Sequence, residues 1–324
     1  MEKHRRFRRL GEPGRHLRVS VWALLCLWLI IPSGALVRLT GSGLGCSNVP
    51  PYCKDGSILP ALTGHALIEY TNRLFSGFVM LLTLFAWLTV RRAAGGGSVG
   101  KWWLAAALCT VGQIPLGALT VAFDLHPLLV SSHFMLSLVA LGLGTVATMR
   151  ARDRASGTTR GRAKQPQAAL GTVTALALLV GLVTGILVTA AGPHSGDRLK
   201  VRRFGVLGDA AYIHVRAVFT FAILAVVLAV IVGRRAKLEA LGRRLLTPWL
   251  VLVAVQIFLG EWQYRHGFPW QMILAHVTIA GLLWTLTVAL AMMVAAPVIE
   301  RAASPPPVGD ALTGNAPLGV RADL

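Results

Sequence analysis

Two histidines in this chain occupy the same place in two matching stretches of sequence. Gln113 opens the segment Gln-Ile-Pro-Leu-Gly, and His133 follows its glycine by 16 residues. Gln256, 143 residues after Gln113, opens Gln-Ile-Phe-Leu-Gly, and His276 again follows the glycine by 16 residues. Apolar stretches surround both histidines, and an imidazole inside a membrane is costly unless it has a function, most commonly metal binding. We therefore predict a duplicated membrane protein with an equivalent metal-binding histidine in each half.

The composition supports a protein with several membrane spans. Of the 324 residues, 55% are hydrophobic and only 14% are charged, whereas soluble domains carry about 25% charged residues. Apolar runs of about 20 residues are the expected unit of such a protein. Eight of them can be read, at approximately 19–39, 66–90, 103–123, 127–149, 168–190, 212–232, 246–263 and 271–296.

In this interpretation, the basic residues behind the net charge of +19 set the orientation of the helices in the membrane. Most of the 32 lysines and arginines cluster in four stretches: 1–18, 91–101, 150–164 and 234–244. The positive-inside rule then places both termini and the basic loops in the cytoplasm. The external loop 191–211 also carries basic residues and is the exception. Binding to nucleic acid is not expected.

A second match defines the two halves. The first span ends in Ser-Gly-Ala-Leu-Val from Ser33, and the fifth ends in Thr-Gly-Ile-Leu-Val from Thr184. We predict an all-α membrane protein of eight transmembrane helices, built as two tandem four-helix bundles related by a pseudo-twofold repeat along the membrane normal. The predicted parts are a basic cytoplasmic tail (1–18), an N-terminal half (19–149), a cytoplasmic linker (150–167), a C-terminal half (168–296) and a disordered cytoplasmic tail (297–324).

A second imidazole accompanies His276 in the C-terminal half. His214 begins the sixth span at the same predicted depth, and two facing histidines in a four-helix unit are the usual arrangement for a six-coordinate haem. A zinc site would need three or four ligands, and no such cluster is evident. The second span lacks the matching histidine, because Asn72 aligns with His214. His65 lies two helical turns earlier on a similar face.

Charged residues near the outer ends of the spans have two interpretations each. Glu69 could form a structural ion pair with Arg73 at i+4, or act in catalysis or proton transfer. Arg38, Arg73 and Arg216 could bind haem propionates, or extend their charges to the membrane surface.

Two cysteines lie in the first external loop. Cys46 and Cys53 are on the oxidising side of the membrane, which favours a disulfide, structural or redox-active, although two free thiols remain the alternative.

Together these features resemble the haem A synthase family, in particular its actinobacterial branch, over nearly all of 19–296. The conjunction is specific, although no single piece is. The matching features are Gly41 to Cys46 with Cys53, Glu69 with Arg73, Gln113 to His133, Ala191 to Asp197, His214, and Gln256 to His276.

The resemblance implies an oxidoreductase that converts the C8 methyl of haem O to a formyl group, giving haem A for terminal oxidases. It implies haem b held by His214 and His276, haem O as substrate facing His133, Glu69 as the essential acidic residue, and an external disulfide between Cys46 and Cys53. It also implies a protein that lies among the lipids of the bacterial inner membrane and receives haem O from haem O synthase. The electron acceptor stays unidentified, and the oligomeric state stays open, with a homo-oligomer as one option.

The chain departs from the family at Asn72, where a histidine is common. Either His133 alone holds the substrate haem on this axis, or another residue such as His65 substitutes. The competing functions are a di-haem b-type quinol oxidoreductase, which would need two equal ligand pairs, and a transporter or assembly scaffold without cofactor.

Overall fold

The structure is a computed structural model that describes residues 12–46, 53, 57, 59–60, 62–91, 93, 95–162, 165–197, 200–201, 203–234 and 238–301. Its elements in chain order are α2 (Pro13–Leu39), α3 (Gly64–Val90), α4 (Gly97–Ala122), α5 (Pro127–Ala155), β1 (Thr158–Arg160), α6 (Gln165–Ala191), β2 (Gly196–Asp197), β3 (Lys200–Val201), α7 (Leu207–Arg234), α8 (Ala240–Arg265), α9 (Trp270–Ala295) and β4 (Val298–Arg301).

Within the described part of the chain, eight helices are long and apolar enough to cross a membrane, which confirms the all-α membrane prediction. The helices extend beyond the apolar runs. Helix α2 begins at Pro13, which stands at the first helical position where the missing N–H of proline costs nothing. Helix α5 continues to Ala155 and takes in part of the expected linker. Residues 1–11 and 302–324, which hold most of the two predicted tails, lie outside the described residues.

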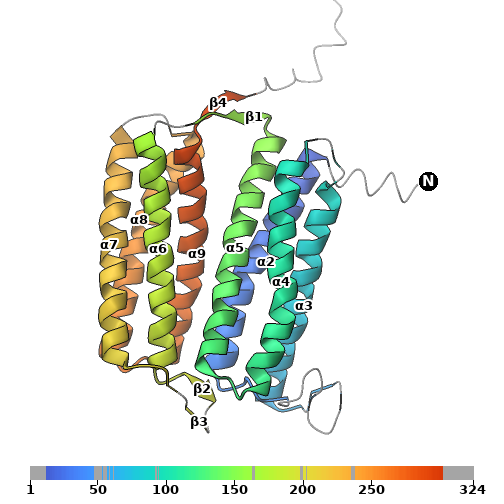
Figure 1. Cartoon of the computed structure of the whole chain (residues 1–324), viewed down its shortest axis with the longest axis vertical. Helices are drawn as coiled ribbons and strands as arrows, with labels where there is room; N and C mark the ends of the chain where they lie inside the picture. Colours follow the sequence, from blue (N-terminus) through green and yellow to red (C-terminus); the bar gives the residue numbers. More distant parts are fainter. Residues whose placement is uncertain are drawn as a thin grey trace, which may run out of the picture.

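The helices pack in two groups of four (Figure 1). In the first group α2 contacts α3, α3 contacts α4, α4 contacts α5, and α5 returns to α2. The second group closes in the same order through α6, α7, α8 and α9. Helix α9 contacts both α2 and α5 and is the main bridge between the groups. The pseudo-twofold relation between the groups stays a prediction.

Tryptophans from both groups stabilise this bridge. The indole N–H of Trp28 in α2 donates to the carbonyl of Thr278 in α9 at 3.0 Å. The indole N–H of Trp284 in α9 donates to the carbonyl of Leu138 in α5, also at 3.0 Å. Gly142 faces the ring of Trp284, where an added Cβ would lie 3.1 Å from its indole nitrogen. Small residues of this kind allow close approach of helices in membranes.

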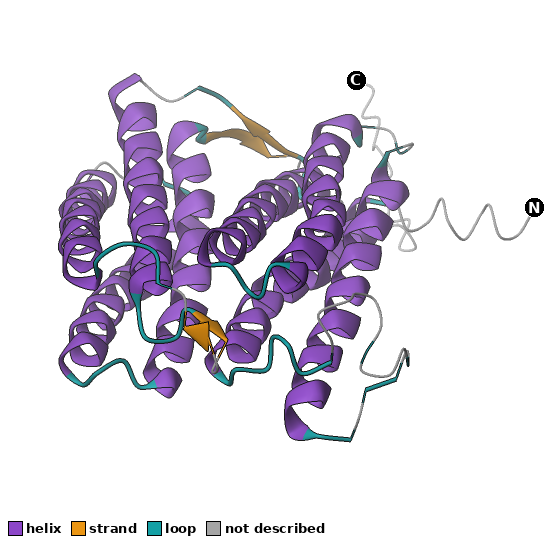
Figure 2. Cartoon of the chain, turned by 60° about the horizontal axis from the view of Figure 1, so that its bottom comes forward, coloured by secondary structure: helices purple, strands orange, loops and turns teal. Residues whose placement is uncertain are grey.

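Two short antiparallel sheets lie at opposite ends of the helices (Figure 2). Strand β4, formed by 298–301 of the segment expected to be disordered, pairs with β1, and β2 pairs with β3. At the end of β1, the guanidinium of Arg160 contacts Asp153 at 2.6 Å and Glu239 at 3.0 Å, and Glu239 also pairs with Arg152 at 3.0 Å. This buried ion network ties the end of α5 to the start of α8.

His16 corrects an expectation drawn from charge alone. Its position in the basic N-terminal stretch predicts a solvated side chain, but His16 is fully buried on α2. Its ring nitrogens lie 3.1 Å from Oγ1 of Thr89 and 3.2 Å from Oγ of Ser20, and the indole N–H of Trp103 donates to the same serine. The expectation is wrong because the helix begins before His16 and turns it toward α3 and α4.

Candidate functional site

His276 is held by two residues of the neighbouring helix. The amide Nε2 of Gln256 on α8 donates to the carbonyl of His276 on α9 at 2.9 Å. One turn along α8, Gly260 makes room for the ring, since a Cβ there would lie 3.3 Å from Cε1 of His276. The side-chain Oε1 of Gln256 and the Nδ1 of His276 are buried without a hydrogen-bond partner in the described structure. Buried polar atoms without a hydrogen-bond partner are rare in proteins, and a polar ligand or a water molecule bound within the bundle would explain these two.

His214 on α7 is oriented by helix α6. Its Nδ1 lies 3.0 Å from the carbonyl oxygen of Gly181 and 3.1 Å from Oγ1 of Thr184. A carbonyl only accepts, so Nδ1 carries the proton and Nε2 keeps its lone pair. An imidazole held in this way is prepared for metal ligation through Nε2.

The two histidines of the C-terminal group lie near one another. They come from α7 and α9, which are not neighbours in the ring of helices and so face each other across the group. The arrangement fits the predicted pair of imidazoles across a four-helix unit.

His133 repeats the environment of His276 in the first group. The Nε2 of Gln113 on α4 donates to the carbonyl of His133 on α5 at 3.1 Å and to Oγ of Ser137 at 2.8 Å. A Cβ on Gly117 would lie 3.3 Å from Cε1 of His133, the same distance as in the second group. Nδ1 of His133 and Oε1 of Gln113 are again buried without a partner among the described residues.

The turns that lead into the two histidine helices are also equivalent. Asp124 and Leu125 between α4 and α5 have φ of 52° and 55°, and Gly267 and Phe268 between α8 and α9 have φ of 73° and 61°. The second pair lies 143 residues after the first, which is the spacing of the sequence repeat. Two consecutive left-handed residues are uncommon, so the same backbone path is built twice.

Asn72 occupies the position that corresponds to His214. The hydroxyl of Ser33 on α2 donates to Oδ1 of Asn72 on α3 at 2.9 Å, just as Thr184 on α6 contacts His214 on α7. His65, considered as a substitute, is exposed at the start of α3, and its Nδ1 lies 2.9 Å from Oγ of Ser42, which follows α2.

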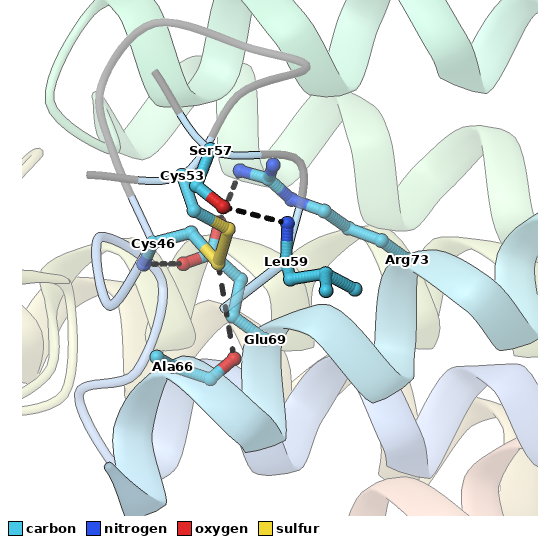
Figure 3. Close-up of a disulfide and its surroundings, with 7 residues drawn as sticks. All are labelled: Cys46, Cys53, Ser57, Leu59, Ala66, Glu69 and Arg73. Atoms are coloured by element: carbon cyan, nitrogen blue, oxygen red, sulfur yellow. Dashed lines mark hydrogen bonds and ion pairs between the residues drawn. A yellow bond between two sulfur atoms is a disulfide. The ribbon is translucent and has the colours of Figure 1, made fainter. Parts of the chain in front are cut away.

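Glu69 is buried beneath the disulfide loop (Figure 3). Its Oε2 accepts the backbone N–H of Cys46 at 2.8 Å, and its Oε1 forms an ion pair with Arg73. Cys46 and Cys53 form the predicted disulfide, and both are buried. The ion pair with Arg73 is thus present, and the carboxylate also holds Cys46 against α3.

The three candidate arginines differ in their contacts. Arg73 is committed to Glu69, and Arg216 is exposed with its guanidinium 3.6 Å above the ring of Tyr212. Arg38 is half-buried at the end of α2, and no described residue forms a hydrogen bond or ion pair with its side chain. Of the three, Arg38 is the best placed to satisfy an anionic group brought by a ligand.

The described residues do not form a site that could hold a metal ion by side chains alone. No three His, Cys, Asp or Glu side chains come together within the described ranges. The paired imidazoles, with one ring tautomer fixed and polar atoms left unpartnered, fit a planar metal cofactor with two axial ligands.

Sequence reasoning found the histidines but missed the residues that support them. Thr184 and Ser33 were used only to align the repeat, and the roles of Gly181 and Gly185 were not recognised. Their spacing of four on α6 was the available signal, because it places both on the same face as Thr184.

No family model matches the chain. It is similar to proteins named heme A synthase, with 32% identity over 138 residues to that of Bacillus licheniformis (40% of this chain, 43% of the relative). The relative from Listeria welshimeri is 29% identical over 125 residues (37% and 40%), and that from Alkalihalophilus pseudofirmus 28% over 144 residues (42% and 47%). The chain thus spans less than half the length of these relatives in each match. The similarity to heme A synthases is thus limited to about 40% of this chain in each match.

Proposed function

We propose that this protein is a haem A synthase that oxidises the C8 methyl of haem O to a formyl group by successive hydroxylations. The observation that carries the proposal is the glutamine–glycine–histidine unit, built twice with the same contacts around His133 and His276. The names of the relatives agree with it.

The C-terminal group is proposed to hold haem b between His214 and His276. The hydrogen bond from Nδ1 of His214 to Gly181 leaves its Nε2 as the nitrogen available for a ligand, and Gly260 leaves space for the ring of His276. A haem with both axial positions filled supplies electron transfer rather than substrate chemistry.

The N-terminal group is proposed to hold the substrate haem O, with His133 facing its iron. Arg38 would pair with a propionate, since its side chain has no charge partner among the described residues. Glu69 would steer the substrate or accept the proton released as the methyl is oxidised. Because Arg73 and the N–H of Cys46 both contact the carboxylate, proton transfer would require the ion pair to loosen.

The surroundings proposed for this function follow the family. The protein would lie in the bacterial inner membrane with both termini in the cytoplasm, receive haem O from haem O synthase and supply terminal oxidase assembly.

Pigment analysis tests the proposal. The protein is expressed with and without a haem O source, and its haems are extracted in acid and separated by chromatography. We expect haem b alone without haem O, and haem A or its hydroxylated precursor when haem O is supplied. Haem b that never changes would favour the di-haem electron-transfer alternative.

Single substitutions then separate the two groups of helices. His276→Ala should remove haem b, whereas His133→Ala should keep haem b and abolish conversion of haem O. His266→Ala is the matched control, because that histidine is exposed at the end of α8 and stacks on Trp262. Equal loss of haem b in all three variants would contradict the assignment.

A further inference from the structure

A groove of about 640 Å³ lies between α2 and α3, near the end of the helices where α2 begins. Two arginines, Arg15 and Arg18, line one end of it, and the other lining side chains of both helices are apolar. Three of these are the aromatic residues Trp22, Phe78 and Phe85. Trp22 is 62% exposed and Phe78 is 54% exposed. The groove is therefore open to the surroundings of the bundle, apolar along its length and cationic at one end.

The two arginines lie at the level where lipid head groups are expected. Helix α2 has 27 residues, which corresponds to about 40 Å at 1.5 Å per residue, whereas the hydrocarbon core of a bilayer is about 30 Å thick. The first turns of α2, which hold Arg15 and Arg18, therefore extend beyond the hydrocarbon. Trp22 follows one turn later, at the interfacial depth that tryptophan prefers. From Arg18 to Cys26 the groove follows α2 for about 12 Å into the layer of acyl chains.

The positive charge at this end of the groove is available to a ligand. Arg18 forms no hydrogen bond or ion pair with a described residue, and it is exposed. Arg15 pairs with Glu12 at 3.6 Å, but their side chains are 44% and 56% exposed, and exposed pairs contribute little. The first turn of α2 has no acidic residue, and Glu12 makes no side-chain capping hydrogen bond. The helix N-terminus thus adds the positive end of its dipole to the two guanidinium groups.

The second group of helices lacks this chemistry at the matching positions. The two Gly-x-Leu-Val segments of α2 and α6 are 151 residues apart. At this spacing Arg15 and Arg18 align with Pro166 and Ala169, and the tryptophan of the groove aligns with a valine. Orientation in the membrane accounts for basic residues at this end of α2, but not for their position on the face that lines the groove. The repeated fold forms without them, so we looked for a ligand.

We propose that this groove binds one anionic phospholipid from the leaflet that meets the start of α2. The phosphate contacts Arg15 and Arg18, and an acyl chain lies along Trp22 and the phenylalanines of α3. Basic pockets between membrane helices on the cytoplasmic side are a common binding place for anionic head groups. The inference is independent of the haem chemistry proposed above, because the groove contains none of the candidate haem ligands.

Native mass spectrometry of the purified holoprotein tests the inference. Bound lipid is first removed by extended washing in detergent. The protein is then titrated with phosphatidylglycerol or with phosphatidylcholine of the same acyl chains. We expect one phosphatidylglycerol to be retained at concentrations where phosphatidylcholine is not. Equal retention of the two lipids would mean ordinary solvation of an apolar surface and would overturn the inference. This comparison uses the wild-type protein and does not depend on the folding of any variant.

Substitutions locate the binding site. Arg15→Gln and Arg18→Gln should each lower the affinity for phosphatidylglycerol about fivefold, and the double variant about 30-fold. Glu12→Gln should raise this affinity, because it removes the carboxylate that competes with the phosphate for Arg15. Arg244→Gln is the matched control, since Arg244 is exposed in the second turn of α8 and lies outside the groove. An equal loss of affinity in Arg244→Gln would show diffuse attraction to the basic end of the protein and overturn the site.

Haem content and thermal unfolding of each variant separate this inference from the proposed function. We expect the double variant to lose phosphatidylglycerol binding at unchanged haem content. A quinone found in the wild-type protein and absent from the double variant, at unchanged phosphatidylglycerol binding, would assign the groove to another occupant and overturn the inference. Failure to convert haem O in a protein that still prefers phosphatidylglycerol would remove the proposed function and leave the lipid site standing.

Discussion

Substituting Gly185 by alanine should displace His214 and weaken haem b binding. The added methyl would lie 3.0 Å from Cε1 of the ring, whereas carbon atoms in good contact are about 3.5–4.0 Å apart. The ring must therefore move by about 0.5 Å or more. Its Nδ1 hydrogen bonds to Gly181 and Thr184, now 3.0 and 3.1 Å, would lengthen toward the limit of a hydrogen bond.

The magnitude follows from two opposing terms. Overpacking of this kind costs about 1–3 kcal/mol, while glycine to alanine inside a helix stabilises by about 1 kcal/mol. The protein should thus lose between about 0 and 2 kcal/mol in its free energy of unfolding. A loss of about 1.4 kcal/mol in ligand placement would lower haem affinity about tenfold.

Gly181→Ala is the matched control, because it lies one turn away on the same helix and its added methyl would meet Val218 at an ordinary 3.7 Å. The assay compares the haem-to-protein ratio after purification and the thermal unfolding of both variants. We expect reduced haem b only in Gly185→Ala. Equal haem content and equal melting temperatures in the two variants would refute the argument that the glycine exists to seat the ring.

Three other perturbations have directions set by the structure. Burial would raise the pKa of Glu239, but hydrogen bonds from Arg152 and Arg160 outweigh burial and hold the pKa below its usual range. The ionised carboxylate therefore stabilises the folded protein above the ordinary glutamate pKa of about 4.3. This stabilisation is lost as the pH falls through the lowered pKa. Glu239→Gln should cost about 1.5–3 kcal/mol at neutral pH and flatten the acid side of a melting-temperature profile, and an unchanged profile would contradict this. Cys53→Ser should lower the free energy of unfolding by about 2 kcal/mol, and adding a reductant to the wild-type protein should lower it equally. Lost activity without lost stability would instead mark the disulfide as redox-active. His16→Leu should cost about 1–3 kcal/mol, because it removes one hydrogen-bond partner from each of the buried hydroxyls of Ser20 and Thr89. Denaturation in detergent measures the loss, and a solvated histidine would give no change.

The membrane helices were predictable because hydropathy and length determine them almost alone. Their ends were not, since Pro13 and Ala155 lie in charged sequence that no apolar run includes. His16 shows the same limit, because a basic stretch predicts solvation only where it lies outside a helix. Strand β4 was missed because its pairing with β1 depends on a partner far away in the sequence.

The histidines of the site were predictable from spacing, but their hydrogen-bond partners were not. Which face of α6 meets His214 depends on the rotation of one helix against another, and the sequence does not specify that rotation. The turn at Gly267 carries an ordinary glycine signal, whereas its counterpart at Asp124 and Leu125 carries none, although both pairs adopt the same left-handed backbone. Only the repeat itself would have connected the two turns.

The duplication limits where a difference in chemistry between the two groups can come from. The turns are the same in both and the histidine seats nearly so, and any difference between haems bound by the two groups would therefore have to arise from the residues that differ around them. At the end of the helices next to the disulfide, the first group has Cys46 held by Glu69. The second group has the paired strands β2 and β3 there, with Nε2 of His194 3.0 Å from the carbonyl oxygen of Phe268. On the axis, the difference is Asn72 against His214. If the axial residue alone sets reactivity, exchanging these two should exchange the ligand-binding properties of the groups; if the loop contributes, the exchange will be incomplete and Glu69 becomes the next residue to vary.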